Sequence, residues 1–237
     1  MTFKAFVYSI IKREKSNTEI INLCSFGLII IGVIFSYIYK NVFLIDTGYS
    51  FLFFFVFCGF SAYIFNYFYQ YYDFEKIKNK KKGFLEFDKD ELIINYDEKI
   101  KYEEITHFDL QIDAYYNELI NVSYRGPIEK RSLGISNSLT ITHNSKTKKL
   151  NFKLENKSHL KVLERNLYEI IINEKLINID SKKSIKLIPE QYRKFKEYEE
   201  YIGKQLKARK INCTEGLLLI GYNSYDEAQD LKRKYCR

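Results

Sequence analysis

Two long runs without a charged residue constrain this 237-residue chain more than any other feature. Residues 20–39 give twenty such positions and residues 49–72 give twenty-four. A helix needs about 20 apolar residues to cross the hydrocarbon core of a bilayer, and a backbone in lipid must satisfy its own hydrogen bonds. The runs therefore predict a two-helix transmembrane hairpin over residues 20–72. A buried core helix or a cleaved signal peptide is the alternative, but each normally has a shorter apolar run.

The distribution of basic residues predicts the orientation of this hairpin. Lys and Arg are frequent in residues 1–19 and in residues 73–82, whereas the connection at 41–48 contains Asp46 and no basic residue. Because cytoplasmic flanks carry the excess of Lys and Arg, both termini are expected in the cytoplasm. The chain is thus predicted to be a multi-pass protein of the cell inner membrane. Its compositional bias is typical of an AT-rich, bacterial genome.

Smaller features within and before the hairpin suggest local roles. Residues 1–19 begin with an amphipathic stretch, which predicts an interfacial helix on the inner leaflet; packing on the soluble domain is the alternative. Gly32 and Ser36 form a small-residue pair suited to close helix packing, within the hairpin or in a dimer. Asn66 and Gln70 lie four residues apart near the predicted interface, where hydration is expected.

From Gly83 the pattern changes to short alternating runs. These predict strands at 84–87, 91–96, 99–102, 105–112, 119–124, 138–142 and 149–155, with an irregularity near His107 and a helix that begins at Ser158. The predicted helix has one apolar stripe, formed by Leu160, Leu163, Leu167, Ile170 and Ile171. Seven strands with tight turns indicate an antiparallel barrel or sandwich, and the stripe suits a helix that caps its open end.

Three stretches of this region carry a resemblance to a known family: residues 83–87 (GFLEF), 100–105 (IKYEEI) and 134–141 (GISNSLTI). Together with the order of seven strands and one helix, they resemble bacterial pleckstrin-homology (PH)-like domains tethered behind two transmembrane helices. The resemblance covers about residues 20–175 and implies a binding or scaffolding module without chemistry. The first predicted turn, Asp88-Lys89-Asp90, is acidic, which argues against a phosphoinositide pocket there.

The remaining chain, residues 185–237, is expected to form a helix–strand–helix extension after a linker at 180–184. Pro189 suits the first turn of a helix, and Ser224 with Glu227 forms a capping box for a last helix. Between them, residues 217–222 (LLLIGY) form a compact apolar run, interpreted as a strand that pairs with the domain's edge or with a partner's sheet. The overall expectation is an α+β chain with four parts, at 1–19, 20–72, 83–178 and 185–237.

No arrangement of residues in the sequence predicts an active site, a metal or a cofactor. His107, His143 and His159 are scattered, and no phosphate-binding loop, dinucleotide-binding or hydrolase motif is present. The four cysteines, Cys24, Cys58, Cys213 and Cys236, lack metal-site spacing and are expected as free thiols in a reducing compartment. The chain is therefore predicted not to be an enzyme.

The functional expectation is a membrane-anchored cytoplasmic module that recruits a protein partner to the inner membrane or forms a homo-oligomer. An inner-leaflet lipid sensor is the main alternative; a membrane-bound enzyme and an immunity or defence accessory protein are weaker ones, and nucleic acid is disfavoured as a partner. Lipid-headgroup contact is predicted for Lys76, Lys78, Lys80, Lys81 and Lys82. Partner binding is predicted for Leu217, Leu218, Leu219, Ile220 and Tyr222.

Overall fold

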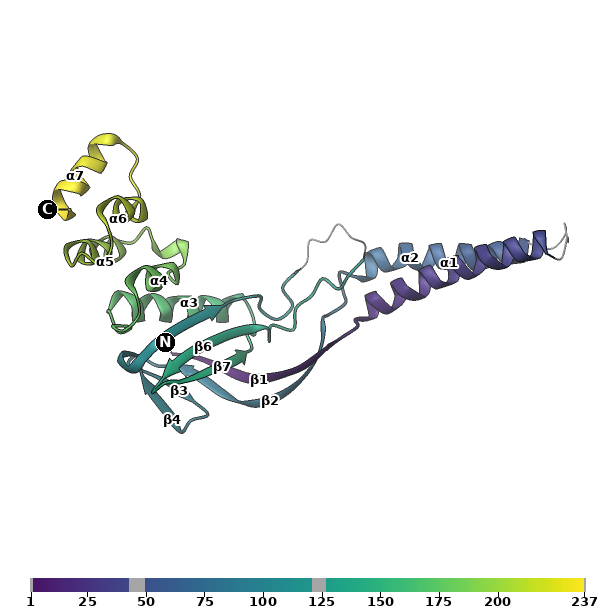
Figure 1. Cartoon of the computed structure of the whole chain (residues 1–237), viewed down its shortest axis with the longest axis horizontal. Helices are drawn as coiled ribbons and strands as arrows, with labels where there is room; N and C mark the ends of the chain where they lie inside the picture. Colours follow the sequence, from purple (N-terminus) through teal and green to yellow (C-terminus); the bar gives the residue numbers. More distant parts are fainter. Residues whose placement is uncertain (1, 43–49, 121–126, 237) are drawn as a thin grey trace. The chain divides into compact units, whose positions relative to one another are not determined.

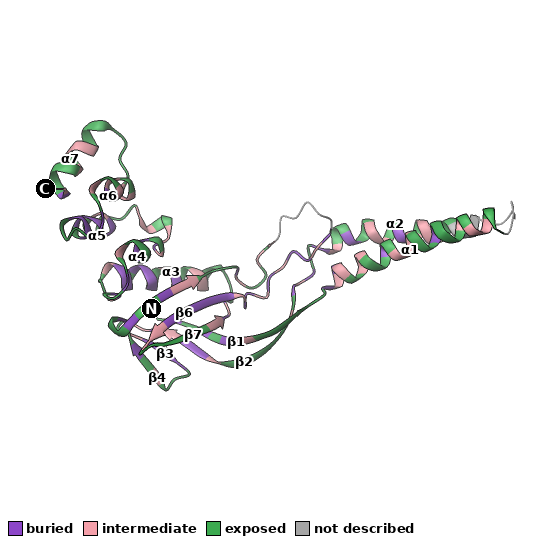
Figure 2. Ribbon diagram, viewed as in Figure 1, coloured by how far each residue is buried: buried purple, intermediate pink, exposed green. Residues whose placement is uncertain are grey.

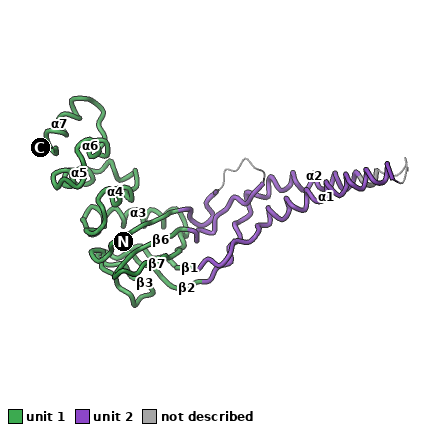
Figure 3. Tube along the Cα trace, viewed as in Figure 1, with its two compact units in different colours: residues 1–8, 81–112, 137–237 green, residues 9–80, 113–136 purple. Residues whose placement is uncertain are grey.

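The computed structural model describes residues 2–42, 50–120 and 127–236, with side chains omitted at 50–52. It divides into two compact units, one formed by residues 1–8, 81–112 and 137–237, and the other by residues 9–80 and 113–136 (Figure 3). The first unit contains most of the sheet and the C-terminal helices, and the second contains the helical hairpin.

A seven-stranded open sheet, most of which lies in the first unit, has the strand order β4-β3-β2-β1-β7-β6-β5 (Figure 1). Its strands are β1 (Phe3–Glu14), β2 (Lys76–Phe87), β3 (Glu91–Ile94), β4 (Glu98–Lys101), β5 (Ile105–Gln111), β6 (Asn137–His143) and β7 (Lys146–Phe152). The predicted barrel or sandwich is thus an open sheet, in which β4 and β5 are the edge strands. A register shift between Ile105 and His107 confirms the predicted irregularity.

The first strand corrects the prediction of an interfacial helix in residues 1–19. Phe3, Ala5 and Val7 are buried on one face, and Val7 pairs with Phe152 of β7. Side chains of a strand alternate between its two faces, so these three residues, each two positions apart, all point into the core. Residues 3–14 therefore supply a central strand of the sheet.

Other predicted strands have mixed outcomes. The turn at Asp88–Asp90 joins β2 to β3 as expected, with Phe87 paired to Leu92. No strand includes Leu119 or Ile120, although Leu119 forms an isolated bridge with Arg131. The remainder of the strand predicted at 119–124 lies outside the described residues.

Helix α3 (Lys157–Ile172) packs on the sheet after β7 (Figure 1). Asn156 caps it by accepting a hydrogen bond from the His159 backbone N–H at 2.9 Å. Four residues of the predicted stripe, Leu163, Leu167, Ile170 and Ile171, are buried, whereas Leu160 is half-buried. The His159 ring stacks on Phe3 with a centroid distance of 4.6 Å, which fixes α3 against β1.

The C-terminal extension is entirely helical in its regular elements. It contains α4 (Ser181–Lys186), a 3-10 turn (Glu190–Tyr192), α5 (Lys196–Lys207), α6 (Cys213–Ile220) and α7 (Tyr225–Tyr235). The predicted linker at 180–184 is therefore largely helical, and the predicted strand at 217–222 is mostly α6. Ser224 caps α7 by accepting from the Glu227 backbone N–H, which confirms one half of the predicted capping box; the Glu227 carboxylate accepts from the Asn223 backbone N–H at 2.7 Å instead.

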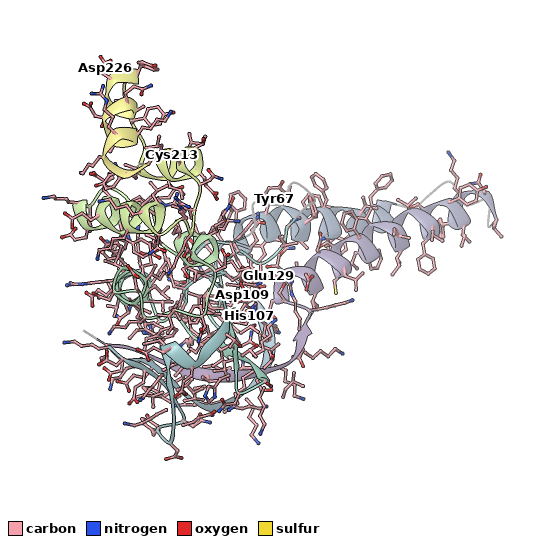
Figure 4. The ribbon with its side chains drawn as sticks, turned by 60° about the vertical axis from the view of Figure 1, so that its left-hand side comes forward. Tyr67, His107, Asp109, Glu129, Cys213 and Asp226 are labelled. Carbon is pink, nitrogen blue, oxygen red and sulfur yellow. A yellow bond between two sulfur atoms is a disulfide. The ribbon has the colours of Figure 1, made fainter. Side chains whose placement is uncertain are left out.

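A disulfide between Cys213 and Cys236 joins the start of α6 to the end of α7 (Figure 4). The prediction of free thiols is therefore wrong for these two residues, whereas Cys24 and Cys58 are free. The pairing escaped prediction because 23 residues separate the two cysteines and only the turn between α6 and α7 brings them together.

Candidate membrane-interface site

The two helices of the second unit, α1 (Asn17–Asn41) and α2 (Ser50–Tyr69), pack directly against each other. A methyl group added at Gly32 would lie 2.8 Å from Val56 Cγ2, and one added at Gly59 would lie 2.7 Å from the Ser25 carbonyl oxygen. Both distances are shorter than a carbon atom tolerates, so these glycines permit the close approach. Gly32 thus permits close packing within the hairpin, which is one of the two roles predicted for it from the sequence.

Much of the outer surface of this helix pair is exposed (Figure 2), and its exposed side chains are largely apolar. Only 11% of the apolar window of α1 is buried, unlike the core helix of a soluble protein. The exposed side chains include Leu23, Phe26, Ile30, Val33, Phe53, Phe57, Phe60 and Phe68. Such a surface is stable in hydrocarbon and unfavourable in water.

Among the described residues, α1 is the one helix long and apolar enough to cross a membrane. The described apolar part of α2, residues 53–69, is shorter. A signal sequence near an N-terminus can satisfy the same criteria. Of the two spans predicted from sequence, the structure thus supports one candidate directly.

Buried polar groups join the start of α1 to the end of α2. The side-chain amide of Asn66 donates to the Thr18 carbonyl oxygen at 2.9 Å, and an oxygen of Asp73 accepts from the Thr18 backbone N–H at 2.7 Å. Asn66 is fully buried and Gln70 is 3% exposed, so the prediction that both are hydrated is wrong. The Gln70 side-chain amide donates to the Tyr67 carbonyl oxygen at 2.7 Å, so both amides bind backbone carbonyls within the hairpin.

Two buried carboxylates hold the segment 127–134 to the end of the hairpin where α1 begins and α2 ends. Glu129, labelled in Figure 4, pairs with the guanidinium of Arg13, and the hydrogen bond that Arg13 donates to Glu129 raises the pKa of Arg13. One oxygen of Glu75 accepts from the Ser132 hydroxyl and the Leu133 backbone N–H, both at 2.8 Å. Sequence reasoning missed this cluster because its members are 57 to 116 residues apart.

The five predicted headgroup lysines all lie on β2 and are exposed. Lys76 donates to Asn17 Oδ1 at 2.8 Å, and Asn17 in turn donates to the Tyr69 hydroxyl at 3.2 Å. A surface groove at this point includes Lys76, Lys78, Tyr69 and Tyr72 in its lining, together with Glu14 and the largely buried Asp73 and Glu75. Lysine, tyrosine and a helix start at one place suit the polar boundary of a membrane.

The lysines do not form one compact cluster. A strand rises about 3.3 Å per residue, so Lys82 lies about 20 Å along β2 from Lys76. Within the first unit, the ammonium of Lys81 lies 3.2 Å from the centroid of the Phe6 ring, an arrangement typical of a cation–π contact. The structure therefore separates Lys76 and Lys78, which lie at the groove, from Lys80, Lys81 and Lys82 farther along the strand.

The predicted partner-binding residues lie on α6 and just beyond it. Leu218 is 66% exposed and Tyr222 is 44% exposed, whereas Leu217, Leu219 and Ile220 are half-buried. The interpretation as an edge strand is wrong because Asn212 caps a helix here, accepting from the Glu215 backbone N–H at 2.8 Å. A short apolar run cannot be assigned to strand or helix by periodicity alone.

The three histidines occupy separate environments. His107, labelled in Figure 4, lies on β5 and is exposed; His143 contacts Glu104 at 2.9 Å, and His159 contacts the Lys4 carbonyl oxygen at 2.8 Å. Within residues 2–42, 50–120 and 127–236, no three His, Cys, Asp or Glu side chains are grouped so that they could hold a metal ion. Comparison of the chain with protein-family models, curated proteins and solved structures gave no match.

Proposed function

We propose that this chain is a two-span membrane-anchored module that presents its sheet and C-terminal helices to a protein partner at the cytoplasmic face of the inner membrane. The observation that carries the proposal is the position of the helical hairpin. The hairpin lies between β1 and β2, which are neighbours in one sheet.

Adjacent strands restrict how the hairpin can meet a bilayer. Because β1 leads into α1 and β2 follows α2, the start of α1 and the end of α2 must be on the same side of any membrane. A single crossing would place two hydrogen-bonded strands on opposite sides. If α1 crosses the membrane, α2 must cross it in the opposite direction. The direct contact between the two helices at Gly32 and Gly59 supports that pairing.

The same connection argues against a cleaved signal sequence. Cleavage after α1 would remove β1 as well, although β1 lies between β2 and β7 in the sheet. Phe3, Ala5 and Val7 would be lost from the core, where each is at most 5% exposed. An uncleaved anchor retains this strand.

The side of the membrane is proposed from the basic residues that flank the hairpin. Their excess before α1 and after α2 supports a cytoplasmic location for the sheet. The Cys213–Cys236 disulfide points the other way, because stable disulfides are typical of oxidising compartments. In the cytoplasm the Cys213–Cys236 bond would be a transient or redox-sensing disulfide.

The binding role itself is supported by two features of the first unit. Six strands follow the hairpin and lead into α3, and this order supports a PH-like assignment as part of the proposal, although β1 precedes the hairpin and the sheet is open. Leu218 provides an exposed apolar side chain on α6, with Tyr222 after the helix. A contiguous apolar patch rimmed by polar residues marks a partner-binding surface, and the proposal places Leu218 and Tyr222 in such a patch.

Topology can be tested with single cysteines in a background where the native cysteines are replaced. Thr47→Cys is expected to react with an impermeant maleimide added to intact cells, whereas Ser145→Cys should react only after the membrane is opened. Labelling of Ser145→Cys in intact cells would overturn the cytoplasmic assignment. Labelling of neither residue in cells, with loss of the protein from the membrane fraction at high pH, would overturn the anchor.

The partner can be tested by native mass spectrometry of the gently extracted protein. A stoichiometric protein partner or a second copy of the chain is expected, and Leu218→Asp should remove it. Tyr225→Ala is the matched control, because Tyr225 is 75% exposed but lies on α7. A wild-type protein that carries no second chain would contradict the binding role.

A second candidate function, a sensor of anionic lipid, is favoured by the groove that Lys76 and Lys78 help to line. Each basic residue close to an anionic leaflet contributes about 1 kcal/mol, so Lys76→Gln/Lys78→Gln should weaken retention of phosphatidylglycerol by roughly 30-fold at low salt. Lys80→Gln/Lys82→Gln removes the same charge farther along β2. Equal losses in the two variants would exclude a specific headgroup contact.

A further inference from the structure

A basic pocket lies in the C-terminal extension, where the chain turns from α5 into α6. Lys182 of α4, Lys207 of α5, and Arg209 and Lys210 of the connection contribute cations to its wall. Leu206, Ile211, Asn212, Tyr235 and the Cys213–Cys236 disulfide complete the lining. The pocket thus combines an apolar floor with four positive charges and has no carboxylate in its lining.

Most of this charge is not neutralised by neighbours. Lys182 is paired with Glu215 at 2.6 Å, and that hydrogen bond raises the pKa of Lys182. Lys207, Arg209 and Lys210 form no salt bridge with any residue in the described part of the chain. Three unpaired cations at one pocket repel one another, and an anion between them relieves that repulsion.

Two of these basic residues have a defined backbone conformation at the end of α5. Lys210 N–H donates to the Gln205 carbonyl at 3.0 Å and Arg209 N–H donates to the Leu206 carbonyl at 2.9 Å, which is the Schellman pattern at the end of a helix. Arg209 therefore has a left-handed φ of 56°. Glycine is the usual residue at such a position, so Arg209 adopts a strained backbone conformation there, with its side chain exposed at the pocket.

The start of α6 adds donors to the same wall. Asn212 caps the helix with its side chain, and Cys213 is its first residue. The first backbone N–H groups of a helix have no intrahelical acceptor, and the helix dipole favours negative charge at this end. Amides, a guanidinium and ammonium groups are the donors that proteins use for phosphate oxygens.

We propose that the pocket at the α5–α6 connection binds a phosphate group of a multiply charged ligand, with Lys207, Arg209 and Lys210 as the principal contacts. The floor formed by Leu206, Ile211 and Tyr235 accepts the organic part of that ligand. The phosphate belongs either to a soluble organic phosphate or to a lipid headgroup. The inference does not depend on the membrane anchor, because every residue of the pocket lies in the first unit.

The experiment is calorimetric titration of the full chain, held in phosphatidylcholine nanodiscs, with inorganic pyrophosphate at low salt. One saturable site is expected, and Arg209→Gln/Lys210→Gln should weaken its affinity by about 100-fold, at roughly tenfold for each charge-assisted contact. Lys194→Gln/Lys204→Gln, which removes two exposed charges outside the pocket lining, should leave it within about twofold. Arg209→Lys should retain part of the affinity, because it keeps the charge but not the planar fork.

Two further measurements make the result decisive. The disulfide content and Tm of the variants must match those of the wild type, and Lys207→Gln serves as a second variant if the double variant is unstable. Competition by phosphatidylglycerol placed in the nanodiscs identifies a lipid headgroup as the ligand, whereas unchanged pyrophosphate binding identifies a soluble phosphate. The site is refuted if wild-type protein shows no saturable binding, or if both double variants lose affinity equally.

Discussion

The side-chain amide of Asn66 donates to the backbone carbonyl of Thr18, and it thereby ties the last turn of α2 to the first turn of α1. The Asn66 side chain is completely buried. Its contact closes the open end of the hairpin on the side where the chain enters and leaves the sheet.

Replacement of Asn66 by alanine should loosen this end of the hairpin. The Thr18 carbonyl would lose its side-chain donor in a poorly hydrated place, which should lower the free energy of unfolding by roughly 1–2 kcal/mol. Ser61→Ala, at an exposed position of the same helix, is the control. Thermal unfolding in one detergent compares the two, and equal Tm values would show that the Asn66 contact contributes nothing.

Gly59 and Gly27 offer a paired test of helix packing. A methyl group at Gly59 would meet backbone of α1, whereas one at Gly27 has no atom within 4 Å. Gly59→Ala should therefore destabilise the hairpin by about 1–3 kcal/mol, and Gly27→Ala should be neutral or slightly stabilising. Tm in one detergent compares the two variants, and an unchanged Tm for Gly59→Ala would contradict the close approach of the helices.

The local sequence pattern predicted those helices and strands that are determined by neighbouring residues along the chain. Apolar length alone predicted the hairpin segments, and alternation predicted β3, β4 and β6 within one or two residues. β1 was missed because Phe6 and Ile10 place apolar groups on the face opposite Phe3, Ala5 and Val7, which obscures the period of two. The sequence pattern 217–220 is equally compatible with strand and helix, and only the cap at Asn212 decides between them.

The candidate sites depended far less on local pattern. Lysines 76–82 were identified from composition, but their division into a pair at the groove and a set farther along β2 needs the strand geometry. The ion pair of Arg13 with Glu129 spans 116 residues, and the basic pocket joins α4 to the α5–α6 connection. Contacts of this kind arise from tertiary packing, and a short stretch of sequence contains no signal that predicts them.

Gly203 determines how α7 docks on α5. A methyl group there would lie 2.2 Å from Tyr235 Cε1, so Gly203→Ala should displace the Tyr235 ring and its hydrogen bond to Glu199. Since α7 is otherwise mostly exposed, the disulfide at its end should become more accessible. Thiol trapping during treatment with dithiothreitol should show severalfold faster reduction than in the exposed control Lys204→Ala; an unchanged rate would mean that Tyr235 does not protect the bond.

His159 should make the contact between α3 and β1 sensitive to acid. Its Nε2–H donates to the Lys4 carbonyl, and its Nδ1 accepts from the Glu155 backbone N–H at 3.2 Å, so the folded state requires the neutral ring. Burial lowers the pKa of His159 below the ordinary value of 6.5. The unfolded chain therefore binds the proton more readily, and stability should fall as pH decreases from about 6.5 through the lower pKa of the folded state.

Protonation of Nδ1 would remove the acceptor for Glu155 and place a charge beside the stacked Phe3 ring. Tm measured between pH 7.5 and pH 5 should decrease more steeply for the wild type than for His159→Gln, which does not titrate in this range. His107→Gln, at an exposed position on β5, should retain the wild-type slope. If His159→Gln and the wild type show parallel Tm profiles, the neutral ring of His159 has no part in the stability of this contact.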